Sequence, residues 1–430
     1  MVLLAINTTI VTTGIVVFLI VILILVGILL FAKAKLTAKG DVKISINNGD
    51  RVITTEPGSS LLSTLAGTLL SALGNQKIFL PSACGGKGSC GMCKCQVDSG
   101  AGSILPTETG FFSYKQQHEN WRLACQVKVK ENIEMRIPES VMGIKKWECT
   151  VVSNRNISTF LKEFVVKLPE GENLKFKSGG YIQIDVPALD VDFKDMIIDE
   201  KYKGDWEKMK MFDLKMHNPE PTYRAYSMAN SPAEGNIIML NIRIATPPFD
   251  RAAGAFAPVN PGICSSFIFS RKPGDKVTIS GPYGEFFLRE TNNEMMFIGG
   301  GAGMAPMRSH IFNLFHTMHT DRKVTFWYGA RALQEAPYVD EFNKIQEENP
   351  NFHWTLALDR PDPVADAAGV AYKPGFVHQV IFENYLKNHE NPEDIEYYLC
   401  GPPMMIQAVT KMLYDLGVPD ENVMYDNFGG

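Results

Sequence analysis

The stretch SACGGKGSCGMC, residues 82–93, holds three cysteines in C-x5-C-x2-C spacing with four glycines between them. A fourth cysteine, Cys125, follows in a separate segment. The chain of 430 residues has only eight cysteines, too few for a disulfide scaffold, so this crowding points to a metal site in a reducing compartment. Glycines let backbone N–H groups approach a negatively charged centre closely. The stretch therefore predicts a loop around a metal centre with thiolate ligands.

Two kinds of metal centre take four cysteines. A structural zinc site usually pairs two C-x-x-C knuckles, and only one occurs here, from Cys90 to Cys93. Three close cysteines and a remote one resemble the plant-type [2Fe–2S] ferredoxin arrangement instead, one residue longer in its first gap. For residues 36–137 this resemblance implies a β-grasp ferredoxin domain with a [2Fe–2S] cluster. The implied ligands are Cys84, Cys90, Cys93 and Cys125.

One further thiol, Cys95, is absent from the usual ferredoxin pattern. The residues around it alternate polar and apolar as in a half-buried strand, in which Cys95 would lie about 6.5 Å beyond Cys93. That separation is too long for one cysteine to replace the other, so we expect Cys93 to be the ligand. Cys95 is expected on the same strand face as Val97, as a small hydrophobe. Further strands are expected at residues 42–46, 51–55 and 126–129.

Residues 1–35 predict a membrane anchor. No charged side chain precedes Lys33, and residues 14–32 are all apolar. These nineteen residues would span about 28 Å as a helix, close to the roughly 30 Å hydrocarbon core of a bilayer. Lysines at positions 33, 35 and 39 predict that the rest of the chain is cytoplasmic. A cleaved signal peptide is the alternative, but the apolar run exceeds the usual length of about 7–15 residues and lacks a basic start.

Two larger blocks follow the cysteine-rich one. Residues 147–288 contain short alternating runs such as YIQIDV and IIMLNIRIA, which predict an antiparallel barrel or sandwich. The mixed-charge residues 189–221 interrupt this rhythm and are interpreted as an insertion. Residues 292–430 alternate compact apolar strands with helical stretches, which predicts βαβ units and a parallel sheet. The expected fold class is therefore multidomain, α/β and α+β, behind one transmembrane helix.

The middle block carries motifs for a flavin. RAYS, residues 224–227, resembles the R-x-Y-S motif of the ferredoxin–NADP reductase superfamily, and GICSS, residues 262–266, resembles its second motif. The resemblance implies Arg224 on the flavin phosphate of FAD, Tyr226 on the isoalloxazine ring and Ser227 near N5. Small residues at a helix N-terminus would receive the pyrophosphate, namely Gly262, Ser265 and Ser266. The turn GPYG, residues 281–284, would close an antiparallel FAD barrel.

The last block carries the pattern of a nicotinamide site. FIGGGAGMAP, residues 297–306, predicts a strand, a glycine turn and a helix start, where a dinucleotide pyrophosphate binds. The expected NADH-binding residues here are Gly300, Gly301, Gly303 and Pro306. The acidic residue expected about 20 positions later is not obvious. Arg331 follows the next strand instead, so these residues alone leave NADH and NADPH both open.

Two more positions complete the expected site. Cys400 and Gly401 begin CGPP, which resembles the superfamily's C-G-P motif near the nicotinamide ring; a buried structural thiol is the alternative. Phe428 resembles the terminal aromatic residue that covers the flavin in this superfamily, and simple packing is its alternative. The resemblance thus implies Ser227, Tyr226 and Cys400 as the catalytic side chains.

The order of these parts resembles one family over essentially the whole chain. An anchor, a ferredoxin, an FAD barrel and a nicotinamide domain resemble the F subunits of sodium-pumping NADH:quinone oxidoreductases. The resemblance implies an NADH:quinone reductase of the bacterial inner membrane, with its soluble domains in the cytoplasm and other membrane subunits as partners. Two alternatives are a membrane-anchored NAD(P)H reductase component of an oxygenase, and a zinc-binding scaffold that retains reductase motifs.

Charge and redox chemistry agree with this interpretation. The formal net charge is −5 with no long run of lysine or arginine, so nucleic acid is not expected as a partner. NADH delivers two electrons as a hydride, whereas a [2Fe–2S] cluster accepts one. FAD can take two electrons and release them singly, so it is expected between the two.

Overall fold

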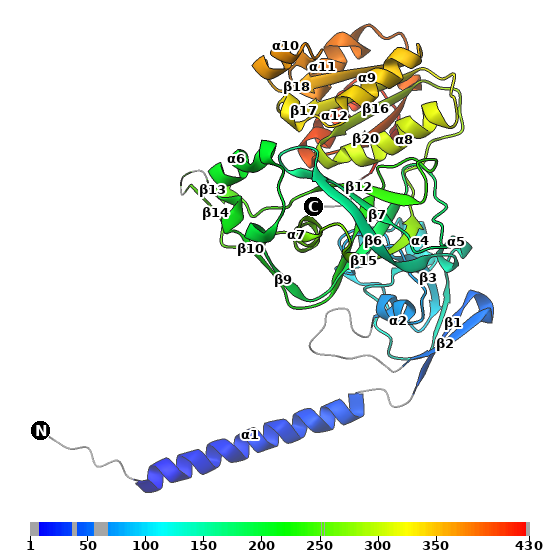
Figure 1. Cartoon of the computed structure of the whole chain (residues 1–430). Coiled ribbons are helices and arrows are strands. Elements are labelled where there is room, and N and C mark those ends of the chain that lie inside the picture. The colour runs from blue at the N-terminus through cyan, green and yellow to red at the C-terminus, as the bar shows by residue number, and fades with distance from the viewer. Residues whose placement is uncertain (1–7, 37–40, 56–67, 251, 253, 427–430) are drawn as a thin grey trace, which may run out of the picture. The chain divides into compact units, whose positions relative to one another are not determined.

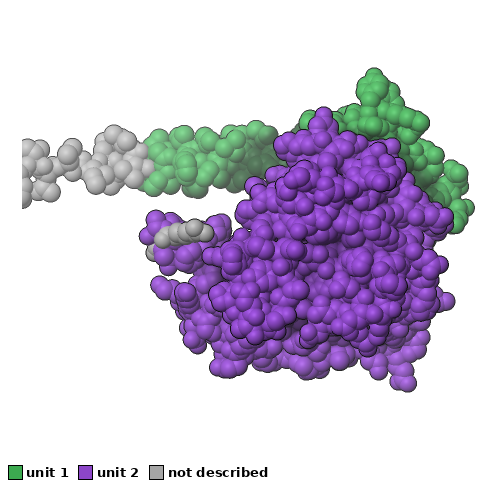
Figure 2. Space-filling model, turned by 90° about the horizontal axis from the view of Figure 1, so that it is seen from above, with its two compact units in different colours: residues 1–80, 86–142 green, residues 81–85, 143–430 purple. Residues whose placement is uncertain are grey.

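The computed structural model describes residues 8–36, 41–55, 68–250, 252 and 254–426 of the chain (Figure 1). Contacts divide it into two compact units, coloured in Figure 2. Unit 1 comprises residues 1–80 and 86–142, and unit 2 comprises residues 81–85 and 143–430.

Helix α1, Thr8–Leu36, is the apolar N-terminal element. Its segment Thr12–Phe31 is long and apolar enough to cross a membrane, and no other helix in the described ranges is. The large apolar side chains along this segment, from Ile15 to Phe31, are exposed rather than packed on the protein. Such an exposed apolar surface is costly in water.

The rest of unit 1 is a five-stranded mixed sheet of order β2-β1-β5-β3-β4, in which only β1 and β5 run parallel. Its strands are β1 Val42–Ile46, β2 Arg51–Thr55, β3 Lys94–Ser99, β4 Trp121–Leu123 and β5 Ile133–Arg136. Short helices join them: α2 Leu69–Asn75, α3 Pro106–Thr109, α4 Tyr114–His118 and α5 Glu139–Met142. The strands expected at residues 42–46 and 51–55 are therefore confirmed.

The strand expected at residues 126–129 is wrong. Residues 124–126 form a turn in which Gln126 N–H donates to the Leu123 carbonyl, and one isolated bridge pairs Lys128 with Thr68. The apolar alternation that predicted a strand comes from Val127 and Val129, which are both buried in the core. Burial of alternate residues does not require a strand where a turn takes the backbone hydrogen bonds.

Unit 2 begins with a six-stranded antiparallel sheet of order β11-β8-β15-β6-β7-β12. A bridge between Met228 and Leu240 joins its two edges, so the sheet closes as a barrel around one apolar core. The strands are β6 Lys145–Asn156, β7 Leu161–Lys167, β8 Tyr181–Val186, β11 Thr222–Ser227, β12 Ile237–Arg243 and β15 Lys276–Tyr283. Helix α7, Ile263–Ser270, and the small pair β13 Phe249–Asp250 and β14 Ala255–Phe256 lie between β12 and β15.

The insertion has a structure of its own between β8 and β11. It folds as a two-stranded sheet with one charged helix, of which Tyr202 and Trp206 are buried. Its elements are β9 Leu189–Asp192, η2 Phe193–Asp195, α6 Glu200–Lys208, η3 Met211–Asp213 and β10 Lys215–Asn218. Trp206 stacks on Phe269 of α7, with ring centroids 6.1 Å apart. This contact joins the insertion to the barrel core.

The remainder of unit 2 is a parallel sheet of order β19-β18-β17-β16-β20-β21. Two separate apolar cores cover its faces, one with α8 and α9 and the other with α11 and α12. Figure 1 shows the sheet together with these helices. The strands are β16 Met295–Gly300, β17 Val324–Ala330, β18 Phe352–Leu358, β19 Lys373–Pro374, β20 Glu396–Cys400 and β21 Val423–Tyr425. The helices are α8 Met304–His316, α9 Val339–Glu348, α10 Pro363–Ala368, α11 Val377–Asn384 and α12 Pro403–Asp415.

Candidate functional site

The Cys93 end of the cysteine loop is fixed by a backbone bond to the segment that carries Cys125. The Ala124 N–H donates to the Cys93 carbonyl at 2.9 Å. The thiols of Cys93 and Cys125 lie within hydrogen-bonding reach, and this contact together with burial raises the pKa of Cys93 far above its usual range. Two buried thiols held together in this way suit a metal centre, which would bind them as thiolates.

The other two expected ligands fall in different units, Cys84 in the unit 2 segment 81–85 and Cys90 in unit 1. Cys84 is buried and Cys90 is half-buried. Within the described ranges no three His, Cys, Asp or Glu side chains are placed to hold a single metal ion. A [2Fe–2S] cluster does not need such a group, because its four thiolates are shared between two irons.

Cys95 lies on the strand face that was expected. It is fully buried on β3 with Val97, and its Sγ contacts the Arg122 carbonyl at 3.8 Å. Burial raises the pKa of Cys95 to about 12. A neutral thiol turned toward the neighbouring strand packs as a small apolar group.

A buried ion pair supports the segment before Cys125, and no local sequence pattern predicts it. Arg122 Nη2 donates to Glu108 Oε2 at 2.8 Å, and both side chains are almost completely buried. Glu108 Oε1 also accepts the Leu123 N–H at 2.8 Å. Arg122 Nη1 donates in addition to two loop carbonyls, those of Ala101 and Gly102. Glu108 therefore fixes β4 directly ahead of the turn that carries Cys125.

The R-x-Y-S residues lie on β11, which pairs antiparallel with β8. Arg224 Nη1 donates to the Tyr223 carbonyl and to Thr222 Oγ1, and these bonds hold its guanidinium beside the strand. Tyr226 is half-buried and packs against the barrel core, where desolvation raises the pKa of its phenol well above the usual range. Ser227 ends the strand and is buried.

The second motif forms the N-terminal turn of α7, with Gly262 as its first flanking residue. A Cβ at Gly262 would lie 2.5 Å from the Ala245 Cβ, so the close approach requires glycine. Ser265 Oγ accepts the Ala245 N–H and donates to the Gly262 carbonyl. Ser266 Oγ is buried and has no hydrogen-bond partner among the described residues. A buried hydroxyl without a partner at a helix N-terminus fits an incoming phosphate, as the pyrophosphate of FAD would require.

The glycine turn lies between β16 and α8, as expected. A Cβ at Gly303 would come within 1.9 Å of the Cys400 carbonyl oxygen, so only glycine fits. Tyr328 of β17 donates its hydroxyl to the Gly301 carbonyl at 3.0 Å. Pro306 is buried in the first turn of α8. The turn therefore packs directly on the start of the CGPP segment, and its backbone can approach a pyrophosphate closely.

Three side chains from distant parts of unit 2 meet where the barrel and the parallel sheet join. Ser227 Oγ donates to Asp426 Oδ2 at 2.7 Å, and the Asp426 N–H donates to the Leu399 carbonyl at 3.0 Å, next to Cys400. Burial raises the pKa of Asp426 to about 7. Burial and then the Asp426 charge raise the pKa of Cys400 well above its usual range. The structure thus brings Ser227 and Cys400 together through Asp426, while Phe428 lies outside the described residues.

Comparison with known proteins places these features in a family. Residues 58–130 match the 2Fe-2S iron-sulfur cluster binding domain, and residues 297–411 match the oxidoreductase NAD-binding domain. The F subunit of the Na(+)-translocating NADH-quinone reductase of Methylococcus capsulatus is 52% identical over 97% of this chain and 98% of its own length. The corresponding F subunit of Idiomarina loihiensis is 52% identical over the same shares.

The chain belongs to the family of F subunits of Na(+)-translocating NADH-quinone reductases.

Solved structures show how widely this fold is used. A cytochrome P450 reductase of Amycolatopsis is similar at a TM-score of 0.59 and 23% identity, over 90% of this chain and 98% of that one. The ferredoxin reductase of a carbazole 1,9a-dioxygenase is similar at a TM-score of 0.56 and 24% identity, over 91% and 99%. These likenesses confirm the expected fold class of ferredoxin, barrel and nicotinamide-type sheet.

Some residues of the site have no sequence signal. Asp426 stands 199 positions from Ser227, so no local pattern joins them. Arg243 is the last residue of β12. Burial lowers the pKa of its guanidinium, and the positive charge of Arg331 lowers it further. The guanidinium groups of Arg243 and Arg331 donate no hydrogen bond to any described residue, and the charge of Glu335 acts to raise the pKa of Arg243.

Helix α8 ties the barrel to the parallel sheet. Arg308 Nη2 donates to Glu234 Oε1 at 2.9 Å, and its Nη1 donates to the Ala229 carbonyl. Ser309 Oγ donates to the Asn230 carbonyl at 2.8 Å. His310 Nδ1 lies 3.2 Å from Ser178 Oγ, and burial lowers the pKa of this imidazole to about 3. Three consecutive residues of the nucleotide helix are therefore bonded to the barrel.

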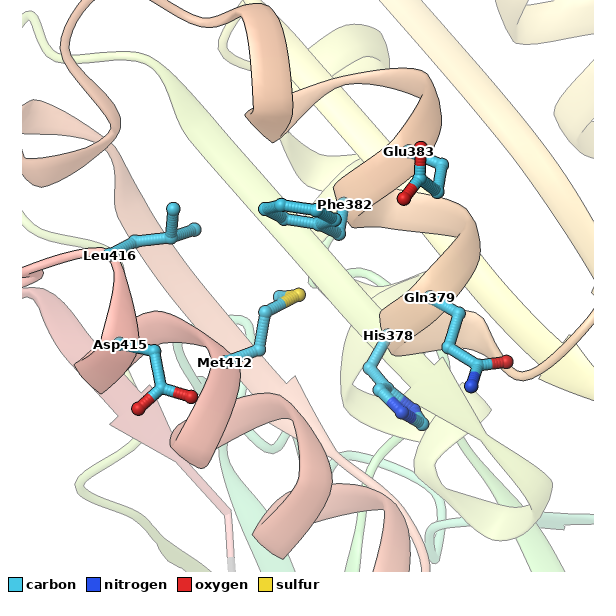
Figure 3. Close-up of a pocket in the computed structure, with 7 residues that line it drawn as sticks. All are labelled: His378, Gln379, Phe382, Glu383, Met412, Asp415 and Leu416. Carbon is cyan, nitrogen blue, oxygen red and sulfur yellow. The ribbon is translucent and has the colours of Figure 1, made fainter.

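A hollow of about 440 Å³ lies between α11 and α12 on one face of the parallel sheet. Phe382 and Met412 point into it from the two helices (Figure 3). Its lining includes none of the motif residues described above. We assign it no part in the site.

The raised pKa of Asp426 predicts a pH dependence of stability. The folded chain keeps a proton up to pH about 7, whereas an unfolded carboxyl with a pKa of about 3.9 has lost it. This contribution is complete below pH about 4 and is lost as the pH rises through about 7. Asp426→Asn should therefore flatten the fall in the temperature of flavin release between pH 5 and pH 8.

Asp420→Asn, at an exposed carboxyl on η8 (Asp420–Asn422), is the matched control and should keep the wild-type slope. Flavin fluorescence during heating measures both. Equal slopes for Asp426→Asn and wild type would show that Asp426 is ionised throughout this range.

Proposed function

We propose that this chain is the NADH-oxidising, electron-input subunit of a sodium-translocating NADH:quinone oxidoreductase. The observation that carries the proposal is the meeting of Ser227, Asp426 and Cys400, which joins the flavin motif to the nicotinamide motif. Family membership at about half identity over nearly the whole chain supports it. In this proposal the domains are residues 36–137 for the cluster, 147–288 for FAD and 292–430 for NADH.

The flavin-side residues have separate tasks in this proposal. When bound, FAD supplies an acceptor that takes two electrons and passes them on singly. Arg224 offers its charge to the flavin phosphate, and the α7 N-terminus with Ser266 receives the pyrophosphate. Tyr226 would lie against the isoalloxazine ring, and the family resemblance implies that Phe428 would cover the flavin. Asp426, with a pKa of about 7, can hold or return a proton at Ser227 Oγ.

The nicotinamide-side residues orient the substrate. The pyrophosphate of NADH is bound by the backbone of Gly300, Gly301 and Gly303 and by the N-terminal turn of α8 at Pro306. Arg243 and Arg331 supply positive charge near it. Cys400 and Gly401 mark the place of the nicotinamide ring beside Ser227. Fixing the ring there supplies the proximity on which hydride transfer depends.

Electrons leave through the proposed cluster domain, residues 36–137, toward the partner subunits. Cys84, Cys90, Cys93 and Cys125 hold the [2Fe–2S] cluster, which accepts one electron at a time. Helix α1 crosses the bacterial inner membrane once, and the lysines after it keep the rest on the cytoplasmic side. Quinone reduction and sodium transport take place in the complex with the other membrane subunits.

The oxygenase-reductase alternative is not favoured. Structures of that kind share 24% identity or less with this chain, a likeness that shows the fold alone. The relatives from Na(+)-translocating NADH-quinone reductases share 52%.

Removal of residues 1–36 tests the proposal. The truncated chain should be soluble, bind FAD and oxidise NADH with an artificial acceptor, because every cofactor motif lies after residue 36. Steady-state rates should favour NADH over NADPH. The full-length chain, purified from membranes, should bring the other subunits with it.

The absorption spectrum of the truncated chain decides between the alternatives. Flavin and iron–sulfur bands are expected, whereas a colourless protein would identify a zinc-binding scaffold. A clear preference for NADPH would place the activity in another reductase class.

A further inference from the structure

The insertion between β8 and β11 has no task in the function proposed above, yet it is bonded to the barrel, and three of the bonds reach the hairpin of β6 and β7. Trp206 of α6 is fully buried, and its Nε1 donates to the Thr159 carbonyl at 2.8 Å. The Asp199 N–H donates to Asn156 Oδ1 at 3.2 Å. Lys162 Nζ donates to the Ile197 carbonyl at 2.6 Å. All three contacts are made by residues of the β6–β7 hairpin, so the insertion is bonded directly to this hairpin.

The same hairpin and the same helix also contact the parallel sheet. Thr159 Oγ1 donates to Glu335 Oε1. Gln334 Nε2 donates to Thr159 Oγ1 and to Asp205 Oδ2 of α6, each at 2.8 Å. Thr159 is buried, so its hydroxyl is shielded from water at the centre of this junction. The short helix η5, Leu333–Glu335, is thereby held from two sides.

The short helix η5 lies close to the glycine turn of the proposed dinucleotide site. It follows β17, the parallel neighbour of the strand that ends in the glycine turn. Burial raises the pKa of Tyr328, and the nearby negative charge of Glu335 raises it further. The Tyr328 hydroxyl donates to the Gly301 carbonyl in the glycine turn. Glu335 therefore lies at the edge of the sheet where the dinucleotide is proposed to bind. An acidic side chain after the second strand of such a fold hydrogen-bonds ribose hydroxyls.

Only one carboxylate oxygen of Glu335 accepts a hydrogen bond from a described residue. Thr159 occupies Oε1, and Oε2 accepts no hydrogen bond from any described residue. A carboxylate oxygen can accept two hydroxyl hydrogens. A half-buried carboxylate fixed in this way can accept hydrogen bonds from two neighbouring hydroxyl groups.

We propose that the insertion is a brace that holds η5 against the barrel, so that Glu335 receives the ribose hydroxyls in the adenosine half of NADH. The proposal rests on the proposed function. Glu335 is the binding residue, and Thr159, Gln334 and Asp205 are positioning residues. Since the adenosine half does not react, these contacts are made equally in the ground state and the transition state. Their loss should raise KM and leave kcat unchanged.

The test uses the full-length protein with its cofactors. Thr159→Val keeps the size of the side chain and removes its hydroxyl; it should raise KM for NADH roughly ten-fold, the effect of losing a hydrogen bond to a charged group. Thr159→Ser should restore the wild-type value. Asp205→Ala should raise KM by a smaller factor, since its bond is more exposed, and Asp205→Asn should restore it. Glu207→Ala removes the same charge from the same helix and should leave KM for NADH unchanged.

A second measurement does not need turnover. Amide hydrogen exchange in residues 331–338 should be faster in Thr159→Val and Asp205→Ala than in wild type or Glu207→Ala, because η5 has lost its support. FAD content should be equal in all variants. The double variant Thr159→Val/Glu335→Gln should be no worse than Glu335→Gln alone, because the hydroxyl acts through the carboxylate.

The outcomes separate the two proposals. If wild type failed to reduce FAD with NADH, the proposed function would fall, whereas the exchange measurement would still test the brace. The brace is rejected if Asp205→Ala matches Glu207→Ala in both exchange and KM. It is also rejected if the variants lower kcat at constant KM. Asp205 is on the surface, so its variant remains informative even if Thr159→Val does not fold.

Discussion

Replacing Cys93 with alanine is expected to abolish the visible absorption of the [2Fe–2S] cluster, whereas replacing Cys95 with valine should leave it unchanged. Cys93 lies beside Cys125 and is bonded through its carbonyl to the turn that carries that residue. Cys95 is turned toward the Arg122 carbonyl in the core. Valine is close to cysteine in volume, so Cys95→Val should change the free energy of unfolding by less than about 1.5 kcal/mol.

Absorption of the purified variants measures both effects, and FAD provides the internal control. Cys93→Ala should keep its flavin and still reduce it with NADH, because the flavin and nicotinamide motifs lie in unit 2. A cluster that survived Cys93→Ala but was lost in Cys95→Val would reverse the ligand assignment.

Replacing Glu108 with leucine is expected to destabilise unit 1 by about 3–5 kcal/mol, since the substitution leaves a buried guanidinium without its partner. Arg122 is almost completely buried and makes its shortest contact, 2.8 Å, with Glu108. The substitution also removes the acceptor of two backbone N–H groups, those of Leu105 and Leu123. Because Leu123 precedes the Cys125 turn, the cluster should be lost together with the fold.

The pair Asp98–Arg136 in the same unit is the matched control. It also has a contact of 2.7 Å, but both side chains are well exposed. Asp98→Ala should therefore destabilise unit 1 much less than Glu108→Leu does. Urea titration followed by cluster absorption compares the two variants. A loss for Glu108→Leu no larger than for Asp98→Ala would mean that the buried pair does not support the fold.

Local chemistry explains which parts could be predicted. The glycine turn was predictable because Gly303 has no room for a side chain, and the R-x-Y-S strand because its residue types are close in sequence. The apolar alternation at Val127 and Val129 led to the wrong prediction of a strand, because both side chains are buried although the backbone there forms no strand. Contacts such as Ser227 with Asp426, or Thr159 with Glu335, join residues 199 and 176 positions apart. No local pattern encodes them, because they exist only after the barrel and the sheet have packed together.

The contacts from Arg308, Ser309 and His310 of α8 to the barrel mean that the chain cannot be cut near residue 290 without loss. A fragment of the parallel sheet alone would keep Arg308 and His310 but lose Glu234 and Ser178, their partners on the barrel. It would also expose apolar surface that Phe286 now covers against Phe297 and Tyr398. Unit 2 should therefore unfold in one cooperative step. Neither the flavin site nor the nucleotide site should persist in a fragment that lacks the other.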